Sequence, residues 1–251
     1  MYAGIDLGST NIKVALYDEN LKLIDRQSRP VVYIRDNGFV EFDALKYAED
    51  LASLLADMAK ANGIKTIREM AFTGQAESPV VRDGEGKPLM NAISWMDERS
   101  EEECKQLEAI FSPEVCEAVT GQMAVLPTWP ATKIAWLRKR RPEIYENAKT
   151  YMLLKDYVVY YLTGVKLSDM SIATFSFYFD IYNKCYWKEM LEAIGISESQ
   201  LPALCEPFTV AGTLTAQAAQ VLGLSTLTKV NVGTLDHFAG MIGTGNITPG
   251  G

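Results

Sequence analysis

The sequence predicts an α/β fold in which a mixed sheet, with helices on both faces, is interrupted by a largely helical insertion. Short alternating or apolar runs near both ends of the chain are typical of strands. Residues 98–205 are instead rich in helix signals and aromatic side chains. Two segments that combine an aspartate with glycines, residues 4–10 and 233–240, each follow a short apolar run.

Residues 1–30 predict three antiparallel strands joined by turns. Residues 1–6 alternate weakly, whereas residues 11–18 alternate cleanly between apolar and polar side chains. Residues 21–30 follow a turn-forming Asp-Glu-Asn cluster. Alternation of this kind is typical of half-buried strands, so the segment is expected to form a meander.

A helix is predicted over residues 43–63, because apolar side chains recur there at helical spacing. Asp43 is a favourable N-cap, and an Asn-Gly pair ends the pattern. Residues 66–72 are expected to form a buried strand. Three hairpin strands, a helix and a further strand are typical of the opening of an actin-like, ribonuclease-H-like α/β unit.

The middle of the chain is predicted to be mostly helical. Two of the expected helices begin with a proline, which suits the first helical turn. The helices are predicted over residues 100–111, 130–140, 142–149 and 155–162.

The pattern of the core resumes after about residue 208. The expected elements are a helix over 215–222, a strand over 229–234 and a helix that begins over 236–242. We therefore predict one substrate domain over residues 1–251, with a core formed by 1–97 and 206–251 and an insertion over about 98–205.

Composition excludes several classes of function. A formal net charge of −8 argues against a nucleic-acid or acidic-membrane partner. The chain has no apolar run long enough to span a membrane and no signal segment at its start, so a cytoplasmic location is expected. A single histidine excludes a His-rich metal site. The four cysteines, Cys104, Cys116, Cys185 and Cys205, are widely spaced and predict reduced, buried thiols.

The first aspartate–glycine segment lies between two predicted strands, so it is a hairpin turn and not a loop that leads into a helix. Gly8 allows backbone N–H groups to approach phosphate oxygens, and Ser9 and Thr10 add donors. Asp6 can reach a hydrated magnesium ion, and Lys13 adds a cation nearby. An ordinary β-turn with a solvent-facing lysine explains the same residues.

A polar loop with Gln75 and Glu77 follows the strand predicted over residues 66–72. Ligands of open α/β sheets bind at the carboxyl ends of strands, and these side chains suit the hydroxyl groups of sugars. Trp95 is a candidate platform for a sugar face, and Asp97 a polar contact. A plain polar loop and a core tryptophan are the alternatives.

Asp236 lies where a predicted strand ends and a helix begins. The positive end of the helix dipole stabilises its ionised form, which can accept a hydroxyl proton. Phosphoryl transfer needs little base strength because its transition state is loose. Plain N-capping of the helix also explains an aspartate at this position.

Six segments in order resemble the N-terminal half of the FGGY carbohydrate kinases, the sugar and polyol kinases of the actin-like ATPase superfamily. The resemblance runs over essentially the whole chain. The segments read GIDLGSTNIKVALYD, TGQAES, SWMDERS, MLLKDYVVYYLTG, LSDMSIATFSFYFD and GTLDHFAGMIGTG.

The resemblance implies ATP-dependent phosphorylation of a sugar or polyol hydroxyl, with ATP and magnesium as cofactors. It implies that Asp236 is the catalytic base and that Asp6 has the metal and phosphate role. Phosphate or nucleotide contacts are expected from Gly8, Ser9, Thr10 and Lys13. Substrate contacts are expected from Gln75, Ala76, Glu77, Trp95, Asp97 and His237.

Two departures from the family pattern leave the sugar unassigned. Ala76 stands where glycerol kinases have arginine, and Glu77 stands where many xylulose kinases have histidine. The resembling kinases are also longer, with a second actin-like domain that carries the adenosine site. The chain is therefore expected to be the substrate-binding half, inactive alone, with the C-terminal nucleotide-binding domain as its missing partner.

Two other functions stay open at this point. One is a non-catalytic sugar-binding half, and the other is a different actin-like ATPase function, such as that of a chaperone or filament protein. The substrate loop and the segments of the helical region argue against the latter, which would not need them. An apolar face left without the second domain favours self-association, for example as a homodimer.

Overall fold

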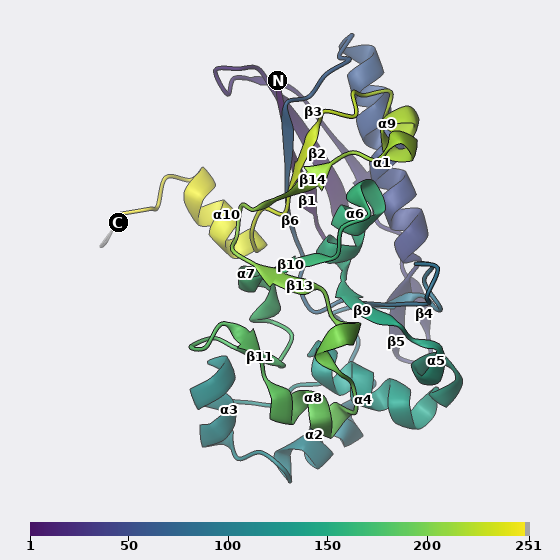
Figure 1. Cartoon of the computed structure of the whole chain (residues 1–251), viewed down its shortest axis with the longest axis vertical. Helices are drawn as coiled ribbons and strands as arrows, with labels where there is room; N and C mark the ends of the chain where they lie inside the picture. Colours follow the sequence, from purple (N-terminus) through teal and green to yellow (C-terminus); the bar gives the residue numbers. More distant parts are fainter. Residues whose placement is uncertain (249–251) are drawn as a thin grey trace.

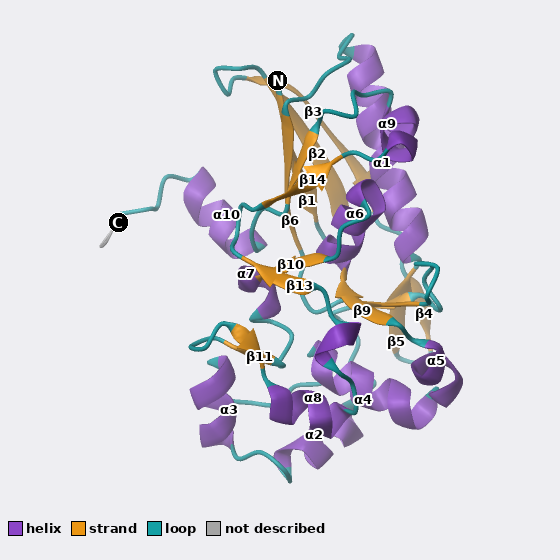
Figure 2. Ribbon diagram, viewed as in Figure 1, coloured by secondary structure: helices purple, strands orange, loops and turns teal. Residues whose placement is uncertain are grey.

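A six-stranded mixed sheet forms one end of the molecule, and a helical region forms the other (Figures 1 and 2). The structure is a computed structural model that describes residues 1–248. Within the sheet the strand order is β14-β15-β6-β1-β2-β3, and β15, β6 and β1 run parallel to one another. The strands are β1 (Tyr2–Leu7), β2 (Asn11–Tyr17), β3 (Leu23–Pro30), β6 (Glu69–Gly74), β14 (Val210–Thr213) and β15 (Lys229–Asn231).

The predicted antiparallel meander is confirmed. β1 pairs with β2 and β2 with β3, each in antiparallel register. In β2 the apolar side chains of Ile12, Val14 and Leu16 are buried, whereas those between them are more exposed, as the alternation predicted. In the same register Asp6 lies opposite Lys13 across the first hairpin.

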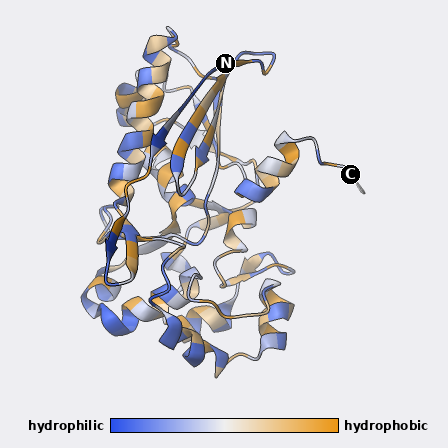
Figure 3. Ribbon diagram, turned by 180° about the vertical axis from the view of Figure 1, so that it is seen from behind, coloured by the Kyte–Doolittle hydropathy of each residue, from blue (hydrophilic) through white to orange (hydrophobic). Residues whose placement is uncertain are grey.

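Three helices pack against one face of this sheet: α1 (Ala44–Ala61), α6 (Leu154–Thr163) and α9 (Ala216–Leu222). Asp43 caps α1 as predicted, since its side chain accepts a hydrogen bond from the Lys46 backbone N–H at 2.9 Å. In Figure 3 α1 carries both hydrophilic and hydrophobic stretches, in keeping with its single buried face.

The opposite face of the sheet is largely open. The short helix α10 (Asp236–Gly243) lies on that side in Figures 1 and 3, and none of its residues is buried. Its side chains are nonetheless partly apolar, and Phe238, Met241 and Ile242 are each at least 46% exposed. One face of the sheet is thus a packed core, and the other has little cover.

The helical region has its own hydrophobic core. The helices predicted from residues 100, 130 and 142 are present, and the two prolines stand in the first turn as expected. The helices of this region are α2 (Glu101–Glu108), α3 (Pro113–Thr120), α4 (Pro130–Arg140), α5 (Pro142–Asn147), α7 (Met170–Ala173) and α8 (Lys188–Ile194), with a 3₁₀ turn at Glu198–Gln200.

Short strand pairs, which the sequence analysis did not predict, tie the molecule together. β4, β5 and β8 form one small sheet, while β7 pairs with β9, β10 with β13 and β11 with β12. Their bounds are β4 (Ile34–Asp36), β5 (Phe39–Phe42), β7 (Pro79–Arg82), β8 (Ala92–Ile93), β9 (Thr150–Leu153), β10 (Leu167–Asp169), β11 (Phe179–Asp180), β12 (Cys185–Tyr186) and β13 (Ala203–Cys205).

Two predicted strands have different limits in the structure. β6 begins at Glu69 and not at residue 66, because Ile67 is buried in the core without pairing in the sheet. β15 ends at Asn231 and not at residue 234, because Gly233 turns the chain with a φ of +67°. Apolar side chains in a segment indicate burial, but a buried segment does not always pair with a neighbouring strand.

Three further expectations concern the domain division, the cysteines and membrane-spanning helices. The division into a core and an insertion over 98–205 stays a prediction, but α6 lies inside that range and packs on the main sheet. Cys104 and Cys116 are buried free thiols, whereas Cys185 is exposed and Cys205 is half-buried. Over residues 1–248, none of the helices is both long enough and apolar enough to cross a membrane.

The carboxyl ends of the parallel strands approach one another very closely. A Cβ atom added to Gly233 would lie 1.6 Å from the carbonyl oxygen of Phe72, and its φ of +67° also disfavours other residues. A Cβ atom added to Gly74 would lie 2.6 Å from the carbonyl oxygen of Leu7. Glycine is therefore required wherever these strand ends touch.

We predict that Gly233→Ala lowers the free energy of unfolding by about 3 kcal/mol or more, since it combines a strained φ with a clash against backbone. Gly223→Ala is the matched control, because Gly223 has a φ of +64° but no atom within 4 Å of an added Cβ. The control should lose only about 1–2 kcal/mol. Urea unfolding of both variants measures the difference, and equal losses would contradict the close approach.

Candidate active site

A cavity of about 660 Å³ lies at the carboxyl ends of β1 and β6 and beside the start of α10. The chain segments that reach it are separated by up to about 230 positions in sequence, and the parallel pairing of β1, β6 and β15 brings them together. Of the predicted site residues, all but Asp97 line this cavity: Asp6, Gly8, Ser9, Thr10, Lys13, Gln75, Ala76, Glu77, Trp95, Asp236 and His237.

The turn between β1 and β2 forms one wall of the cavity. A Cβ atom on Gly8 would lie 2.7 Å from the Asn11 carbonyl oxygen, so the turn requires glycine. The Tyr47 hydroxyl donates to the Gly8 carbonyl at 2.9 Å and holds the turn from α1. The backbone N–H groups and hydroxyls of the turn are thereby placed on a rigid support, as a phosphate site needs.

Asp6 and Lys13 form an ion pair in this wall, with 2.9 Å between Lys13 Nζ and Asp6 Oδ2. The Lys13 side chain is 59% exposed and that of Asp6 is 31% exposed. Exposed pairs of this kind contribute little to stability. Either group can therefore leave the pair and bind a ligand at a small cost in free energy.

Gln75 connects this turn to the predicted substrate loop. Its side chain is buried, with Nε2 donating to the Gly8 carbonyl at 3.4 Å and Oε1 accepting from the Ser78 hydroxyl at 2.9 Å. The Ser78 hydroxyl in turn accepts from the Trp95 backbone N–H at 3.0 Å. The amide of Gln75 thus has structural partners on both sides, although its residue also lines the cavity.

Glu77 presents a carboxyl group with unusual properties. Its φ of +65° is in the left-handed region that non-glycine residues seldom adopt. Burial raises the pKa of Glu77 to about 7, the nearby charge of Lys133 opposes this, and Asp236 adds to it. Near neutral pH this carboxyl group can therefore donate as well as accept a hydrogen bond.

Trp95 and His237 supply the other large groups of the cavity. The Trp95 side chain is 38% exposed, in contrast to the other tryptophans, and it borders the cavity. His237 lies beside Phe175, with ring centroids 6.5 Å apart. An indole face that remains open to solvent is a suitable platform for the C–H face of a sugar.

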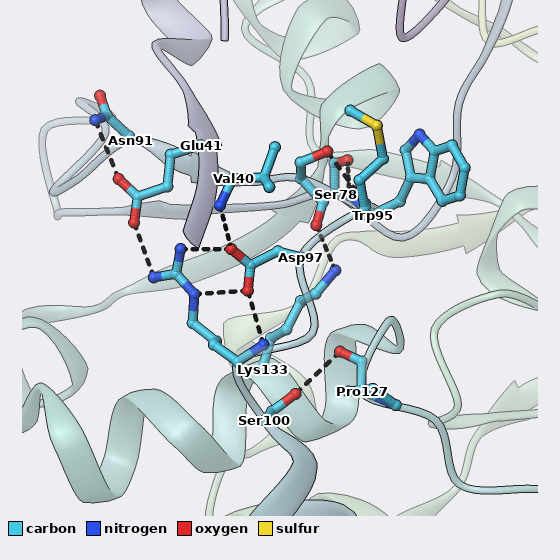
Figure 4. Close-up of polar contacts among 12 residues, drawn as sticks. Val40, Glu41, Ser78, Asn91, Trp95, Asp97, Ser100, Pro127 and Lys133 are labelled. Atoms are coloured by element: carbon cyan, nitrogen blue, oxygen red, sulfur yellow. Dashed lines mark hydrogen bonds and ion pairs between the residues drawn. The ribbon is translucent and has the colours of Figure 1, made fainter. Parts of the chain in front are cut away.

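Asp97 does not fit its predicted contact with a substrate. Its carboxylate is fully buried and accepts two hydrogen bonds from the Arg99 guanidinium, at 2.8 and 2.7 Å. It also accepts from the Val40 backbone N–H at 2.5 Å, and Glu41 binds the far side of Arg99 (Figure 4). Although burial opposes it, these hydrogen bonds hold the pKa of Asp97 below its usual range. Asp97 therefore supports the loop and does not face the cavity.

Asp236 is the first residue of α10, where the dipole of the helix stabilises its charge. Its Oδ1 accepts from the His237 backbone N–H at 2.7 Å, and the side chain is 46% exposed. The N-cap position belongs to Leu235, so Asp236 is not a plain N-cap. The carboxylate remains accessible from the cavity, as a proton acceptor must.

A buried polar network behind Asp236 was missed by sequence reasoning. Ser171 Oγ accepts from the Leu235 backbone N–H and lies 2.9 Å from the Thr234 hydroxyl. Asp169 accepts from Ser171 and from Lys155, which also donates to the Val232 carbonyl at 2.6 Å. The LSDMS and MLLKD segments of the sequence carry Asp169, Ser171 and Lys155.

The chain is similar to known proteins over nearly its whole length. Residues 1–243 match the model of the FGGY family of carbohydrate kinases, N-terminal domain. The xylulose kinase of Escherichia coli is 29% identical over 248 residues, which is 98% of this chain and 50% of that protein. The chain spans about half the length of the curated relatives it matches.

Solved structures extend the likeness. The xylulose kinase structure from Rhodospirillum rubrum has a TM-score of 0.93 at 25% identity and is matched over 99% of this chain and 52% of that one. The xyloylose kinase structure from Brucella ovis has a TM-score of 0.92 at 28% identity, over 99% and 51% respectively.

We predict that Glu77→Gln changes how stability depends on pH. A carboxyl group whose folded pKa is raised to about 7 contributes stability that is complete below its unfolded pKa and is lost as pH rises through 7. Relative to Glu77→Gln, the wild-type chain should lose on the order of 1–2 kcal/mol between about pH 5 and pH 8. Urea unfolding across that range measures this.

Glu85→Gln is the control for this experiment, because the Glu85 side chain is 77% exposed and distant from the cavity. The free energy of unfolding of Glu85→Gln should differ from that of the wild type by the same amount at every pH. If Glu77→Gln also remains parallel to the wild type, the carboxyl group of Glu77 titrates normally.

Proposed function

The chain belongs to the FGGY family of carbohydrate kinases, and from that premise we propose that it is the substrate-binding half of an enzyme that phosphorylates a sugar or polyol hydroxyl with ATP. One observation carries the proposal. The cavity of about 660 Å³ combines a glycine turn with Asp6 at one wall and the helix-start carboxylate of Asp236 at another. In this proposal a phosphate site and a proton acceptor border the same space.

In this proposal Asp236 is the catalytic base. Its carboxylate accepts the proton of the substrate hydroxyl while that oxygen attacks the terminal phosphorus of ATP and the bond to ADP breaks. The transition state of phosphoryl transfer is loose, so an aspartate has sufficient base strength. The hydrogen bond from the His237 backbone N–H, at the start of the helix, orients the carboxylate.

The turn formed by Gly8, Ser9 and Thr10 would contact the transferred phosphate. Within residues 1–248 there is no cluster of three or more His, Cys, Asp or Glu side chains able to hold a metal ion. A single carboxylate is enough for magnesium, because this ion retains several waters and takes most other ligands from phosphates. Asp6 would hold the ion through water, and the ion would neutralise phosphate charge.

For the substrate we propose an uncharged polyhydroxyl compound, with xylulose as the first candidate because several similar proteins, including those of Escherichia coli and Bacillus subtilis, are xylulose kinases. Glu77 and Asp236 both border the cavity, and two acidic groups disfavour a sugar acid. Trp95 and His237 offer a flat face and a ring nitrogen for the sugar. Ala76 leaves room where an arginine would narrow the site.

The partner we propose is a C-terminal nucleotide-binding domain that docks on the open face of the sheet. A groove of about 840 Å³ runs across that face, and Phe208 and Ala239 of α10 border it. Phe238, Met241 and Ile242 of α10 are exposed there. Without that domain these apolar side chains favour self-association. For an ATP-dependent sugar kinase with free thiols we propose the cytoplasm as its location.

We predict that Asp236→Asn, in the protein that joins this chain to its nucleotide-binding domain, lowers turnover of xylulose by about 10²–10⁴-fold. The amide cannot accept the hydroxyl proton, but it has nearly the shape of the carboxylate, so xylulose affinity should remain within a few-fold. Steady-state kinetics and calorimetry measure the two quantities.

Asp57→Asn is the control for charge, because Asp57 is 74% exposed on α1, which packs on the covered face of the sheet. Its turnover should equal that of the wild type. Near-normal turnover in Asp236→Asn would remove Asp236 from the role of base. A higher KM for xylulose with an unchanged kcat would make Asp236 a substrate-binding residue and not the base.

We also predict that the isolated chain folds cooperatively but does not phosphorylate xylulose. Both core clusters are complete within it, whereas phosphoryl transfer needs the nucleotide positioned from the opposite side. A coupled assay of ADP release by the purified chain tests this. Turnover at the roughly 1–10³ s⁻¹ usual for enzymes would place the whole nucleotide site in this half. Xylulose binding with no turnover even after the second domain is supplied would identify a non-catalytic binding protein.

A further inference from the structure

A buried lysine lies directly beneath the two loops that line the proposed sugar site. Lys133 is on α4, and its residue is fully buried. Its ammonium group donates to the Ser94 carbonyl at 2.7 Å and to the Glu77 carbonyl at 3.1 Å. Figure 4 shows the Lys133 side chain pointing toward Ser78 and Trp95. The first carbonyl precedes Trp95, and the second belongs to Glu77 itself. One side chain thus contacts both loops from below.

We propose that Lys133 is a positioning residue that ties the Glu77 loop to the Ser94–Trp95 loop and so holds the two side chains that would bind the sugar. The proposal rests on the proposed function, because it concerns the same site. Lys133 does not border the cavity, so it would act only through the residues it holds.

The Glu77 loop needs such a restraint. Glu77 has a φ of +65°, a conformation that costs a non-glycine residue about 1–2 kcal/mol. Among the described residues, Lys133 is the hydrogen-bond donor to the Glu77 carbonyl. A strained backbone conformation persists only where its surroundings determine it. Loss of this contact would allow the loop to relax and the Glu77 carboxyl group to turn.

The other loop is restrained at the same point. Ser94 is fully buried, and its carbonyl also accepts from the Asp97 backbone N–H at 3.1 Å. Asp97 is in turn fixed by its paired hydrogen bonds with Arg99. Lys133 therefore joins the Glu77 loop to a rigid part of the structure. Figure 4 shows the part of this arrangement around Lys133 and Asp97.

The chemistry of a lysine suits this task better than that of an apolar residue. Burial lowers the pKa of Lys133 to about 7, the carboxylates of Glu77 and Asp97 oppose this shift, and Arg99 adds to it. A neutral amine still has two N–H donors, which is the number of carbonyl groups it contacts. The clamp is therefore expected to persist on either side of neutral pH. An unpaired buried amine would be destabilising, so the carbonyl contacts explain why the position tolerates a lysine.

The test uses the protein that joins this chain to its nucleotide-binding domain, with xylulose as the probe. Lys133→Met retains the length and packing of the side chain but removes both hydrogen bonds. We expect the KM for xylulose to rise by about 10–100-fold, because misplaced binding groups cost up to about 10²-fold. The KM for ATP and kcat should change by less than about threefold, since Asp6 and Asp236 are not held by Lys133.

Ile134→Val is the matched control, because Ile134 is the next residue of α4, is fully buried and contacts neither loop through hydrogen bonds. This change should cost about 0.5–1.5 kcal/mol of stability with no change in the KM for xylulose. Lys133→Gln serves as a second variant if Lys133→Met does not fold, since its amide is too short to reach both carbonyls. It should raise the same KM.

A second measurement needs neither turnover nor sugar. The chain has four tryptophans, and Trp129, Trp136 and Trp187 are each at most 8% exposed. Trp95 is 38% exposed and therefore dominates quenching by acrylamide, a neutral probe. In Lys133→Met the released loop should increase this quenching, and Ile134→Val should leave it unchanged.

The two measurements separate the two proposals. If the wild-type protein does not phosphorylate xylulose but Lys133→Met still increases the quenching of Trp95, the clamp stands and the choice of substrate fails. If Lys133→Met lowers only the melting temperature, with the KM and the quenching unchanged, Lys133 has a structural role and the inference is overturned. A drop in kcat with an unchanged KM for xylulose would also overturn it.

Discussion

The close contact between the ends of three parallel strands is the constraint on which the rest of this structure depends. Gly233 meets the Phe72 carbonyl and Gly74 meets Leu7 at distances that exclude any side chain. This approach brings the turn after β1, the loop after β6 and the helix after β15 to a single edge of the sheet. Parallel strands place their carboxyl ends together, and ligands of α/β sheets bind at such edges.

Behind that edge, buried polar side chains hold the loops, while partly exposed carboxylates border the cavity. Gln75, Ser171 and Lys133 each form hydrogen bonds with the backbone or side chains of neighbouring loops. Asp6 and Asp236, by contrast, keep exposed carboxylates at the cavity. This division is what preorganisation requires, since groups that contact a ligand are precise only when other groups fix them.

The two faces of the sheet differ in a way that bears on function. One face is covered by α1, α6 and α9, whereas the other carries a wide groove and a helix without a buried residue. The chain also spans about half the length of its curated relatives. Both observations support the proposal that a second domain completes the site, because a loose transition state needs charge stabilisation from all sides.

The sequence alone determined the meander, α1 with its Asp43 cap, the proline-led helices and most residues that border the cavity, whose roles stay proposals. Periodicity and capping are local properties of the sequence, and the family motifs mark the points where strands end and helices begin. Only the tertiary structure decided that Asp97 is held by Arg99, that Lys133 joins two loops and that two-residue strands pair. Lys133 joins segments that are 39 and 56 positions away in the chain, which no local pattern records. The Asp97–Arg99 pair and the β11–β12 pair are local in sequence, but what makes the Asp97 pair favourable is burial, and burial depends on the whole fold.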